Sequence, residues 1–268
     1  QAHLLRKGAI RESPLLVRAA CEARKGDLLA DIWILVGVLL ASGLIHGITG
    51  FGFGLFALGV LSVIMPISEA VVIVSVAGLS CFAVNLWSVR GEVPWRETWP
   101  LLVPSIPALW AGVYCLRSLD DRILRAGLGA AILAGCAVVL WSPKSACLHR
   151  ANPWGDIAGV LVGLSGGAVG ASGPPIVLYC LLRGWDKLVD KGVMSAYFSL
   201  IGLWRIAALV VTGVATGETA RKGALMLIPA VLATYLGTRI FRRMSTRLFR
   251  YAALTLLAGL SAKLLFLA

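Results

Sequence analysis

The sequence predicts an all-α, polytopic membrane protein of two tandem pseudo-symmetric repeats, each with a broken or re-entrant helix plus three transmembrane helices. The first observation is composition: 59% of the 268 residues are hydrophobic and 14% are charged, whereas soluble domains carry about 25% charged residues. The second is a series of uncharged runs, most of them close to the roughly 20 residues that cross a bilayer as a helix. The third is that two glycine-rich stretches, SGLIHGITG (42–50) and SGGAVGASG (165–173), share one pattern.

Composition divides the chain into four segments. Residues 1–31 are a polar extension, in which Ser13-Pro14 and the residues after it predict either an amphipathic surface helix or a disordered tail. The first 30 residues show no continuous apolar core, so we expect no signal peptide there. We expect the first transmembrane repeat over 32–141, a linker over 142–155 and the second repeat over 156–268.

Each repeat begins with an apolar stretch that does not fit one simple helix. The first uncharged run, 32–68, has 37 residues and is too long for a single crossing. The run 157–182 contains SGGAVGASGPP, whose glycines and prolines interrupt a helix near its middle. We therefore expect broken or re-entrant segments at 32–66 and 156–182. The ordinary spans expected after them are 69–89, 99–117 and 122–141 in the first repeat, and 189–216, 222–241 and 247–267 in the second.

A second pair of similar stretches supports the repeat. PSIPALWAGVYCLRSLDDRILR (104–125) and PAVLATYLGTRIFRRMSTRLFR (229–250) share six identities at a constant offset of 125 residues, and one of them pairs Gly112 with Gly237. Internal repeats of this size are typical of secondary transporters.

The net charge of +12 indicates membrane topology rather than nucleic-acid binding, because the lysines and arginines lie between the apolar runs. Charge leaves two topologies open. Either every segment crosses once and the basic loops share the cytoplasmic side, or each broken segment turns back and the two copies are inverted. Six cysteines without paired spacing predict neither a disulfide nor a metal site, and we expect no cofactor. The basic loops are 117–125, 183–191 and 239–250.

The two breaks predict a buried anion site. Non-helical backbone at membrane depth needs hydrogen-bond partners from protein or from a water-filled cavity, so both stretches belong inside the protein. Pro174 and Pro175 fit the first turn of a restarted half-helix, and another is expected to begin near Gly54. Such helix starts present unpaired N–H groups and the positive end of the helix dipole, which suit an oxyanion. The candidate substrate-binding residues are Ser42, Thr49, Gly50, Gly52, Ser165, Gly166, Gly170, Ser172, Gly173 and Pro174.

Three further polar residues lie inside expected spans. Arg205 interrupts an apolar run, where a charge usually faces an interior cavity; it either pairs with an anion or bonds to backbone carbonyls. Asn85 either donates to substrate or bridges two helices. His46 lies within the first broken segment, as a candidate for proton coupling or as a hydrogen-bonded structural histidine.

Other interpretations compete for the glycine-rich stretches. Small-xxx-small patterns such as Gly43-x-x-x-Gly47 also serve close helix packing. GLSGG (163–167) matches the G-x-S-x-G pattern of hydrolases, but every histidine precedes Ser165, so no later base is available and we expect no enzyme. The glycine runs lack the G-K-[S/T] of a phosphate-binding loop, so transport would use gradients. A passive anion channel of the same architecture is the main alternative function.

The chain resembles the sulfite exporter TauE/SafE family of membrane permeases over about residues 31–268. The resemblance lies in SGLIHGITGFGFG, NLWSVRGEVPWRETWPLLVPSIPALWAG, SGGAVGASGPP and LIPAVLATYLGTRIFRRMSTRLFR, in this order. It implies a two-repeat transporter of sulfite, sulfoacetate or related small sulfur-containing anions. The family often writes its first break as G-x-G-G-G, whereas GFGFG keeps Phe51 and Phe53, which would narrow the pocket or stack on an organic substrate.

The sequence therefore predicts a secondary transporter, in the exporting direction, for sulfite or organosulfonates. The expected partners are a small anionic substrate and the lipid bilayer, with no nucleic acid and with homo-oligomerisation left open. The expected location is the bacterial inner membrane, crossed several times. Transport would alternate by movement of one repeat against the other.

Overall fold

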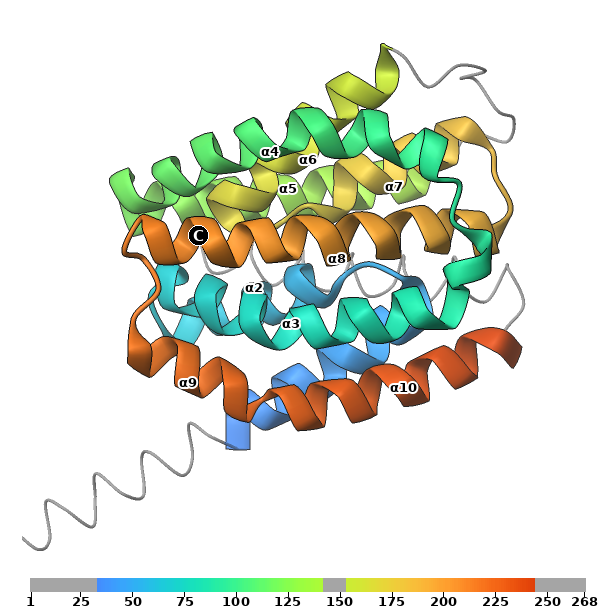
Figure 1. Ribbon diagram of the computed structural model, residues 1–268. Coiled ribbons are helices and arrows are strands. Elements are labelled where there is room, and N and C mark those ends of the chain that lie inside the picture. The colour runs from blue at the N-terminus through green and yellow to red at the C-terminus, as the bar shows by residue number, and fades with distance from the viewer. Residues whose placement is uncertain (1–32, 142–152, 244–268) are drawn as a thin grey trace, which may run out of the picture. The chain divides into compact units, whose positions relative to one another are not determined.

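The computed structural model describes residues 33–141 and 153–243, and within these ranges every regular element is a helix (Figure 1). The predicted all-α class is therefore confirmed. The chain divides into two compact units, 1–37 and 38–268, and the arrangement below concerns the second. The predicted extension, the last expected span and most of the expected linker lie outside the described residues, and the repeat itself stays a prediction.

Short connections join the helices. The first helix covers Trp33–Thr49, of which 38–49 belongs to the second unit. The next elements are α2 (Phe53–Ile64), α3 (Ile67–Val89), the 3₁₀ turn η1 (Arg90–Glu92), α4 (Trp95–Ser118), α5 (Asp121–Trp141), α6 (Trp154–Val169), α7 (Gly173–Arg183), α8 (Lys187–Val211), α9 (Gly217–Leu225) and α10 (Leu227–Arg243).

Several helices are long and apolar enough to cross a membrane, so the chain is a multi-pass membrane protein. Among the described residues these are Ile67–Glu92, Trp95–Ser118 and Lys187–Val211, and α9 with α10 passes the same test as a pair of helices bent by 42°. The bend corrects the expectation of one uninterrupted span over 222–241. Its position has a local cause, because Pro229 has no N–H to donate to the carbonyl of Leu225 and is tolerated only in the first turn of α10.

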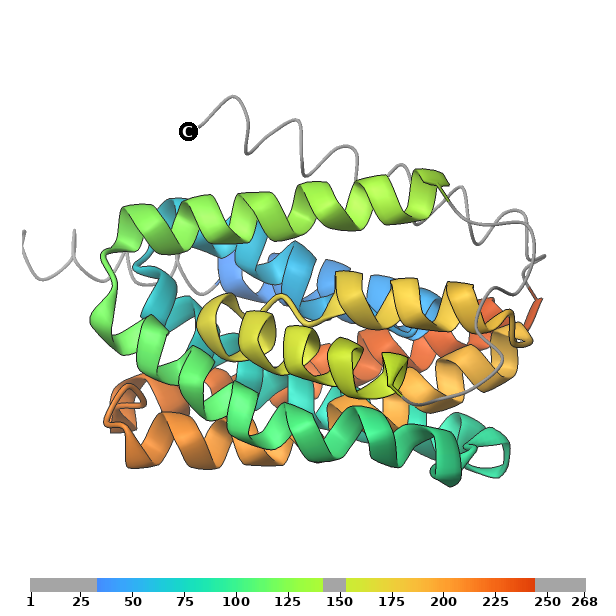
Figure 2. The same ribbon diagram turned by 90° about the horizontal axis from the view of Figure 1, so that it is seen from above.

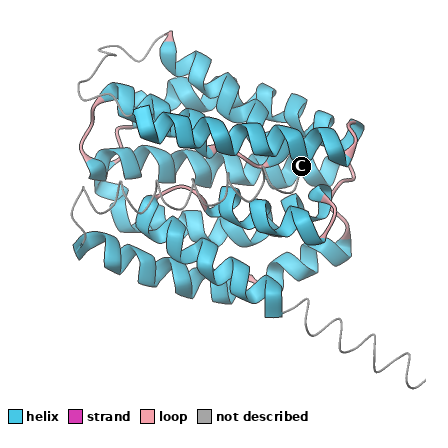
Figure 3. Ribbon diagram, turned by 180° about the vertical axis from the view of Figure 1, so that it is seen from behind, coloured by secondary structure: helices cyan, strands magenta, loops and turns pink. Residues whose placement is uncertain are grey.

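The helices of the second unit pack around α3, which contacts α2, α8, α9 and α10, while α4 packs along α6 (Figures 1 and 2). Each broken segment turns back: α7 runs beside α6 in the opposite direction, and α2 likewise reverses the direction of helix 38–49. The α4–α5 turn and the α7–α8 turn consequently lie at opposite ends of the bundle. The basic loops 117–125 and 183–191 do not share a side, so the single-crossing topology is not the one observed. The view from behind shows the same succession of helices and short loops (Figure 3).

Two helix pairs approach through glycine, as the packing interpretation predicted. A Cβ atom added at Gly43 would lie 2.7 Å from the carbonyl oxygen of Ala230 in α10, and one at Gly167 would lie even closer to that of Leu109 in α4. The residues paired by the proposed repeat make corresponding contacts, since Gly237 meets the backbone of helix 38–49 and Gly112 meets that of α6. Part of each glycine-rich stretch thus serves close packing.

Candidate functional site

The first break separates helix 38–49 from α2 with two glycines in the left-handed region. Gly50 has φ 77° and Gly52 has φ 91°, conformations that glycine adopts without steric cost. The N–H of Gly50 donates to the carbonyl of His46 at 2.7 Å. The Thr49 hydroxyl stays within the break, where it bonds to the carbonyl of Phe51 and accepts from that residue's N–H at 3.3 Å. The backbone polar groups of the break are therefore largely paired locally.

The second break separates α6 from α7 at Gly170, whose φ is 71°. The N–H groups of Gly170 and Ala171 donate to the carbonyls of Gly166 at 3.1 Å and Ser165 at 3.3 Å. The chain restarts as a helix after Ser172, with prolines in the first turn of α7 as predicted. Proline is harmless there because the first N–H groups of a helix have no partner within it.

Two cations of α8 hold the carbonyl ends of the interrupted helices. Lys191 Nζ donates to the carbonyl of Gly47 at 2.6 Å, and the Arg205 guanidinium donates to the carbonyl of Gly166. Each acceptor lies in the last turn before a break, where the helix dipole favours positive charge, and the Gly166 carbonyl also accepts the N–H of Gly170. Lys191 is 1% exposed and Arg205 is 8% exposed. Fourteen residues separate them, close to four turns, so one face of α8 carries both.

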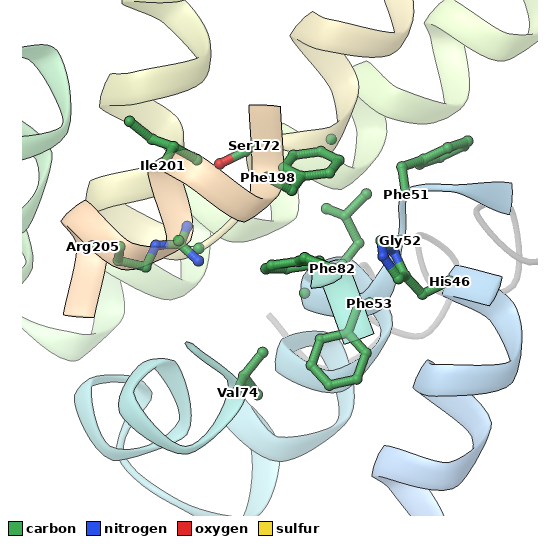
Figure 4. A pocket seen from close by; sticks show the side chains of 15 residues that line it. His46, Phe51, Gly52, Phe53, Val74, Phe82, Ser172, Phe198, Ile201 and Arg205 are labelled. Carbon is green, nitrogen blue, oxygen red and sulfur yellow. The ribbon is translucent and has the colours of Figure 1, made fainter. Parts of the chain in front are cut away.

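Both breaks line one cavity of about 30 Å³ (Figure 4). The first break contributes His46 and 51–55, and the second contributes Gly170, Ser172 and Gly173. The helix starts of α2 and α7 therefore reach the same space. The remaining lining residues come from α3 and α8 and are Val74, Phe82, Phe198, Ile201, Gly202 and Arg205.

Glycine is required where the two breaks meet. A Cβ atom added at Gly54 would lie 2.7 Å from the carbonyl oxygen of Gly170. One added at Gly173 would lie 3.0 Å from a methyl carbon of Leu55. Backbone from the two halves of the chain thus comes into close contact, which side chains at these positions would prevent.

Apart from glycines, the cavity wall consists of four phenylalanines, three aliphatic residues and three polar residues. The His46 ring lies edge-on to Phe82 with centroids 5.0 Å apart, and Phe82 lies 5.5 Å from Phe198. Among the described residues, neither ring nitrogen of His46 makes a hydrogen bond of normal geometry. Ser172 and Arg205 supply the other polar groups. No three His, Cys, Asp or Glu side chains in the described ranges gather closely enough to hold a metal ion.

The structure brings half of the candidate residues together. Asn85 and Gly166 join the cavity group indirectly, because Asn85 Nδ2 donates to the His46 carbonyl at 3.0 Å and Gly166 accepts from Arg205. A Cβ atom at Gly166 would lie against the Ser172 hydroxyl and 3.3 Å from the Arg205 guanidinium. The candidates that line the cavity directly are His46, Gly52, Gly170, Ser172, Gly173 and Arg205.

The other candidates lie away from the cavity lining. The hydroxyls of Ser42 and Ser165 donate to carbonyls of their own helices, those of Val38 and Leu161, both at 2.7 Å. The hydroxyl of Thr49 is bonded within the break. A hydroxyl inside a helix readily makes this bond to the carbonyl four residues earlier, which removes it as a donor to a ligand. Gly50 lies against Lys191 instead of the cavity, and Pro174 is buried outside the lining.

Sequence reasoning missed several residues of this region. Phe82, Phe198 and Gly202 line the cavity from long apolar helices, whose composition gives no local signal. Lys191 was assigned to the basic loop 183–191, although its side chain is buried against the first break. Its place directly before the uncharged run 192–204 was the available signal.

The chain is similar to proteins of one family. The sequence profile of the family described as sulfite exporter TauE/SafE matches residues 34–264. A relative from Cupriavidus necator, described as a probable sulfite/organosulfonate exporter TauE, is 25% identical over 246 residues, which cover 90% of this chain and 96% of the relative. No solved structure matches the chain significantly.

Proposed function

This chain belongs to the sulfite exporter TauE/SafE family, and we propose that it is a secondary transporter that exports sulfite or organosulfonates across the bacterial inner membrane. One observation carries the proposal: two interrupted helices direct the starts of α2 and α7 into a single cavity that Arg205 also lines. The name of the Cupriavidus necator relative supports the same substrate class.

An oxyanion in this cavity would be held by backbone and by two side chains. The starts of α2 and α7 offer N–H groups and positive dipole ends, and the Ser172 hydroxyl faces the same space. Arg205 carries five N–H donors in a planar fork, so it can hold the Gly166 carbonyl and still bind an anion's oxygens. No carboxylate among the described residues forms an ion pair with it. The aromatic wall of Phe82 and Phe198 suits the carbon part of an organosulfonate.

The size of the cavity favours alternation over a passive pore. A volume of about 30 Å³ holds one or two water molecules, which is less than the four heavy atoms of a sulfite ion require. Side chains of the aromatic cluster must therefore move before an anion enters. A site that opens for each ion belongs to a carrier, whereas a channel needs a continuous path.

Flux into liposomes tests this function. The purified protein is reconstituted, and uptake of sulfite, thiosulfate, sulfoacetate and taurine is measured with and without a pH gradient. We expect saturable uptake of at least one sulfur anion that responds to the gradient. Flux that rises linearly with concentration and ignores the gradient would indicate the passive channel, and no flux of any of these anions would refute the substrate class.

We further propose His46 as the coupling group, because its ring lines the cavity and both ring nitrogens lie free of normal hydrogen bonds to described residues. Histidine changes charge near neutral pH, which suits proton coupling. Replacing His46 with Gln should leave anion binding in place and remove the response to a pH gradient. If the variant keeps that response, His46 only fills space among the phenylalanines around it.

A further inference from the structure

Two larger cavities lie at the end of the bundle where α3 and α10 end and α8 begins. One of about 340 Å³ lies beside Lys187 and Lys191, and one of about 760 Å³ lies beside Arg90 and Arg239. Both are lined by Ser88 and Thr238, so they lie next to each other. We call the combined space the vestibule. Four cationic side chains and one carboxylate, that of Glu92, line it.

Lys191 connects the vestibule to the first break. Its ammonium group bonds to the Gly47 carbonyl and lies 4.0 Å from the ring centre of Phe241. Its aliphatic part packs on the break itself, because a Cβ atom at Gly50 would lie 3.1 Å from Lys191 Cγ. A lysine that is 1% exposed in a membrane-spanning helix is costly, and such residues usually lie on an ion pathway.

The vestibule and the central cavity lie along the same two helices. On α3, Phe82 lines the central cavity and Ser88 lines the vestibule; on α8, Phe198 lines the cavity and Lys191 the vestibule. Phe82 and Ser88 are six residues apart, and Lys191 and Phe198 are seven apart. The vestibule and the central cavity are therefore offset by roughly 10 Å along these helices. Asn85 lies between Phe82 and Ser88, and its buried side-chain oxygen makes no hydrogen bond with a described residue. A polar group of this kind marks a place for water or an ion.

We propose that the vestibule is a second anion-binding site, which takes the same small sulfur oxyanions on their way to or from the central cavity. The inference rests on the proposed function for its substrate class. Lys191 closes the passage while it holds the Gly47 carbonyl. An arriving anion replaces that carbonyl as the partner of the ammonium group. The first break then loses its hydrogen bond from Lys191 and is free to move.

The test places a thiol in the vestibule. In Ser88→Cys, the new thiol is modified with two reagents of similar size, one bearing a sulfonate and one bearing a quaternary ammonium, and labelling of the native cysteines in the unmodified chain is subtracted. We expect the sulfonate reagent to react about tenfold faster, because a cation-lined hollow concentrates anions. Added sulfite should slow the reaction of the sulfonate reagent with this thiol. Equal rates, or no protection by sulfite, would overturn the proposal.

Matched variants identify the cations responsible. Lys187→Gln together with Lys191→Gln should lower the ratio of the two rates several-fold, with Arg90 and Arg239 left in place, whereas Arg221→Gln on α9, which does not line the vestibule, should not change the ratio. If Arg221→Gln lowers the ratio equally, net charge explains it and the site is refuted.

Two further experiments distinguish anion binding in the vestibule from binding of lipid headgroups and from binding in the central cavity. Vesicles of neutral lipid and vesicles with anionic lipid should give the same preference; its loss with anionic lipid would mean that the cations bind headgroups, against the proposal. Arg205→Gln should weaken transport and leave the preference intact. A preference that persists when the native chain transports no sulfur anion would refute the proposed function and leave an anion-binding vestibule.

Discussion

At both breaks the chain must satisfy backbone polar groups that no longer pair within a helix, and the two breaks do so with different residues. At the first, two left-handed glycines and the Thr49 hydroxyl pair the backbone locally, and Lys191 holds the last carbonyls. At the second, a single left-handed glycine suffices, the chain restarts on prolines, and Arg205 holds the last carbonyls.

The difference lies in where each cation is placed. Arg205 lines the central cavity with Ser172, while Lys191 lines the vestibule, about 21 Å away along α8. The bonds of Lys191 and Arg205 to the interrupted helices thus also fix where along the bundle each positive charge lies. The two breaks are structurally alike, and we infer different roles for their cations.

The largest expected effect comes from filling the cavity at the second break. Ser172→Leu and Gly173→Leu should each reduce transport about 100-fold or more, because both block anion contacts worth roughly 1.5–3 kcal/mol apiece. Uptake into liposomes measures this, with protein in the membrane quantified separately. Gly129→Leu in α5, where the space around the glycine is open, is the matched control. Normal transport by either cavity variant would count against the site.

Substitutions of Arg205 test whether the cation at the second break binds the anion or only holds the Gly166 carbonyl. Arg205→Gln should weaken sulfite binding by roughly 10- to 100-fold, since hydrogen bonds to a charged group contribute about 1.5–3 kcal/mol. Arg205→Lys should weaken it less, because the charge remains although the planar fork is lost. Calorimetric titration of the purified variants measures both. Equal losses would mean that Arg205 serves only to hold Gly166.

A smaller effect concerns stability at the second break. Gly170 and Gly213 have nearly the same φ, 71° and 73°, but only Gly170 has a neighbour, Leu58, in the way of a Cβ atom. Replacement by Ala should cost about 1–2 kcal/mol of backbone strain at both positions. Gly170→Ala should lower the thermal unfolding midpoint further. Equal midpoints in detergent would show that the Leu58 side chain moves aside at no cost.

The smallest effect separates serines that the sequence treats alike. Ser42→Ala and Ser165→Ala should change the transport rate less than about twofold, because each hydroxyl bonds only to its own helix. Ser172→Ala should lower the rate about tenfold through loss of a donor to the anion. Initial rates in liposomes decide this. A large effect at Ser165 would return that residue to the site.

The helix breaks could be predicted because their signal is local. Clustered glycines together with a Pro-Pro pair inside an uncharged run favour a break in the helix, whereas scattered prolines do not impose one, since α4 continues through Pro100, Pro104 and Pro107. The restart near Gly54 and the prolines at the start of α7 follow from the same rule and are found within one residue of the expectation. Arg205 was visible because a charge inside an apolar run is rare.

The remaining features depend on tertiary contacts. The phenylalanines of the cavity resemble any others in an apolar helix, and only packing shows that Phe82 and Phe198 meet His46. Lys191 was misplaced because a lysine at the end of an apolar run normally reaches for solvent. Ser42 and Ser165 were included among the candidate binding residues because the sequence does not show which hydroxyls bond to their own helix. Whether a broken segment continues or turns back is decided by its neighbours.

Because Lys191 and Arg205 belong to one continuous helix, the two interrupted segments are mechanically linked. An axial slide of α8 by a single residue's rise, about 1.5 Å, would stretch the contacts to Gly47 and Gly166 together. An axial movement of α8 cannot lengthen one of these contacts and leave the other unchanged, unless α8 bends or one of the two side chains extends. Spin labels on α8 paired with labels on α6 and on helix 38–49 should therefore report simultaneous distance changes during turnover.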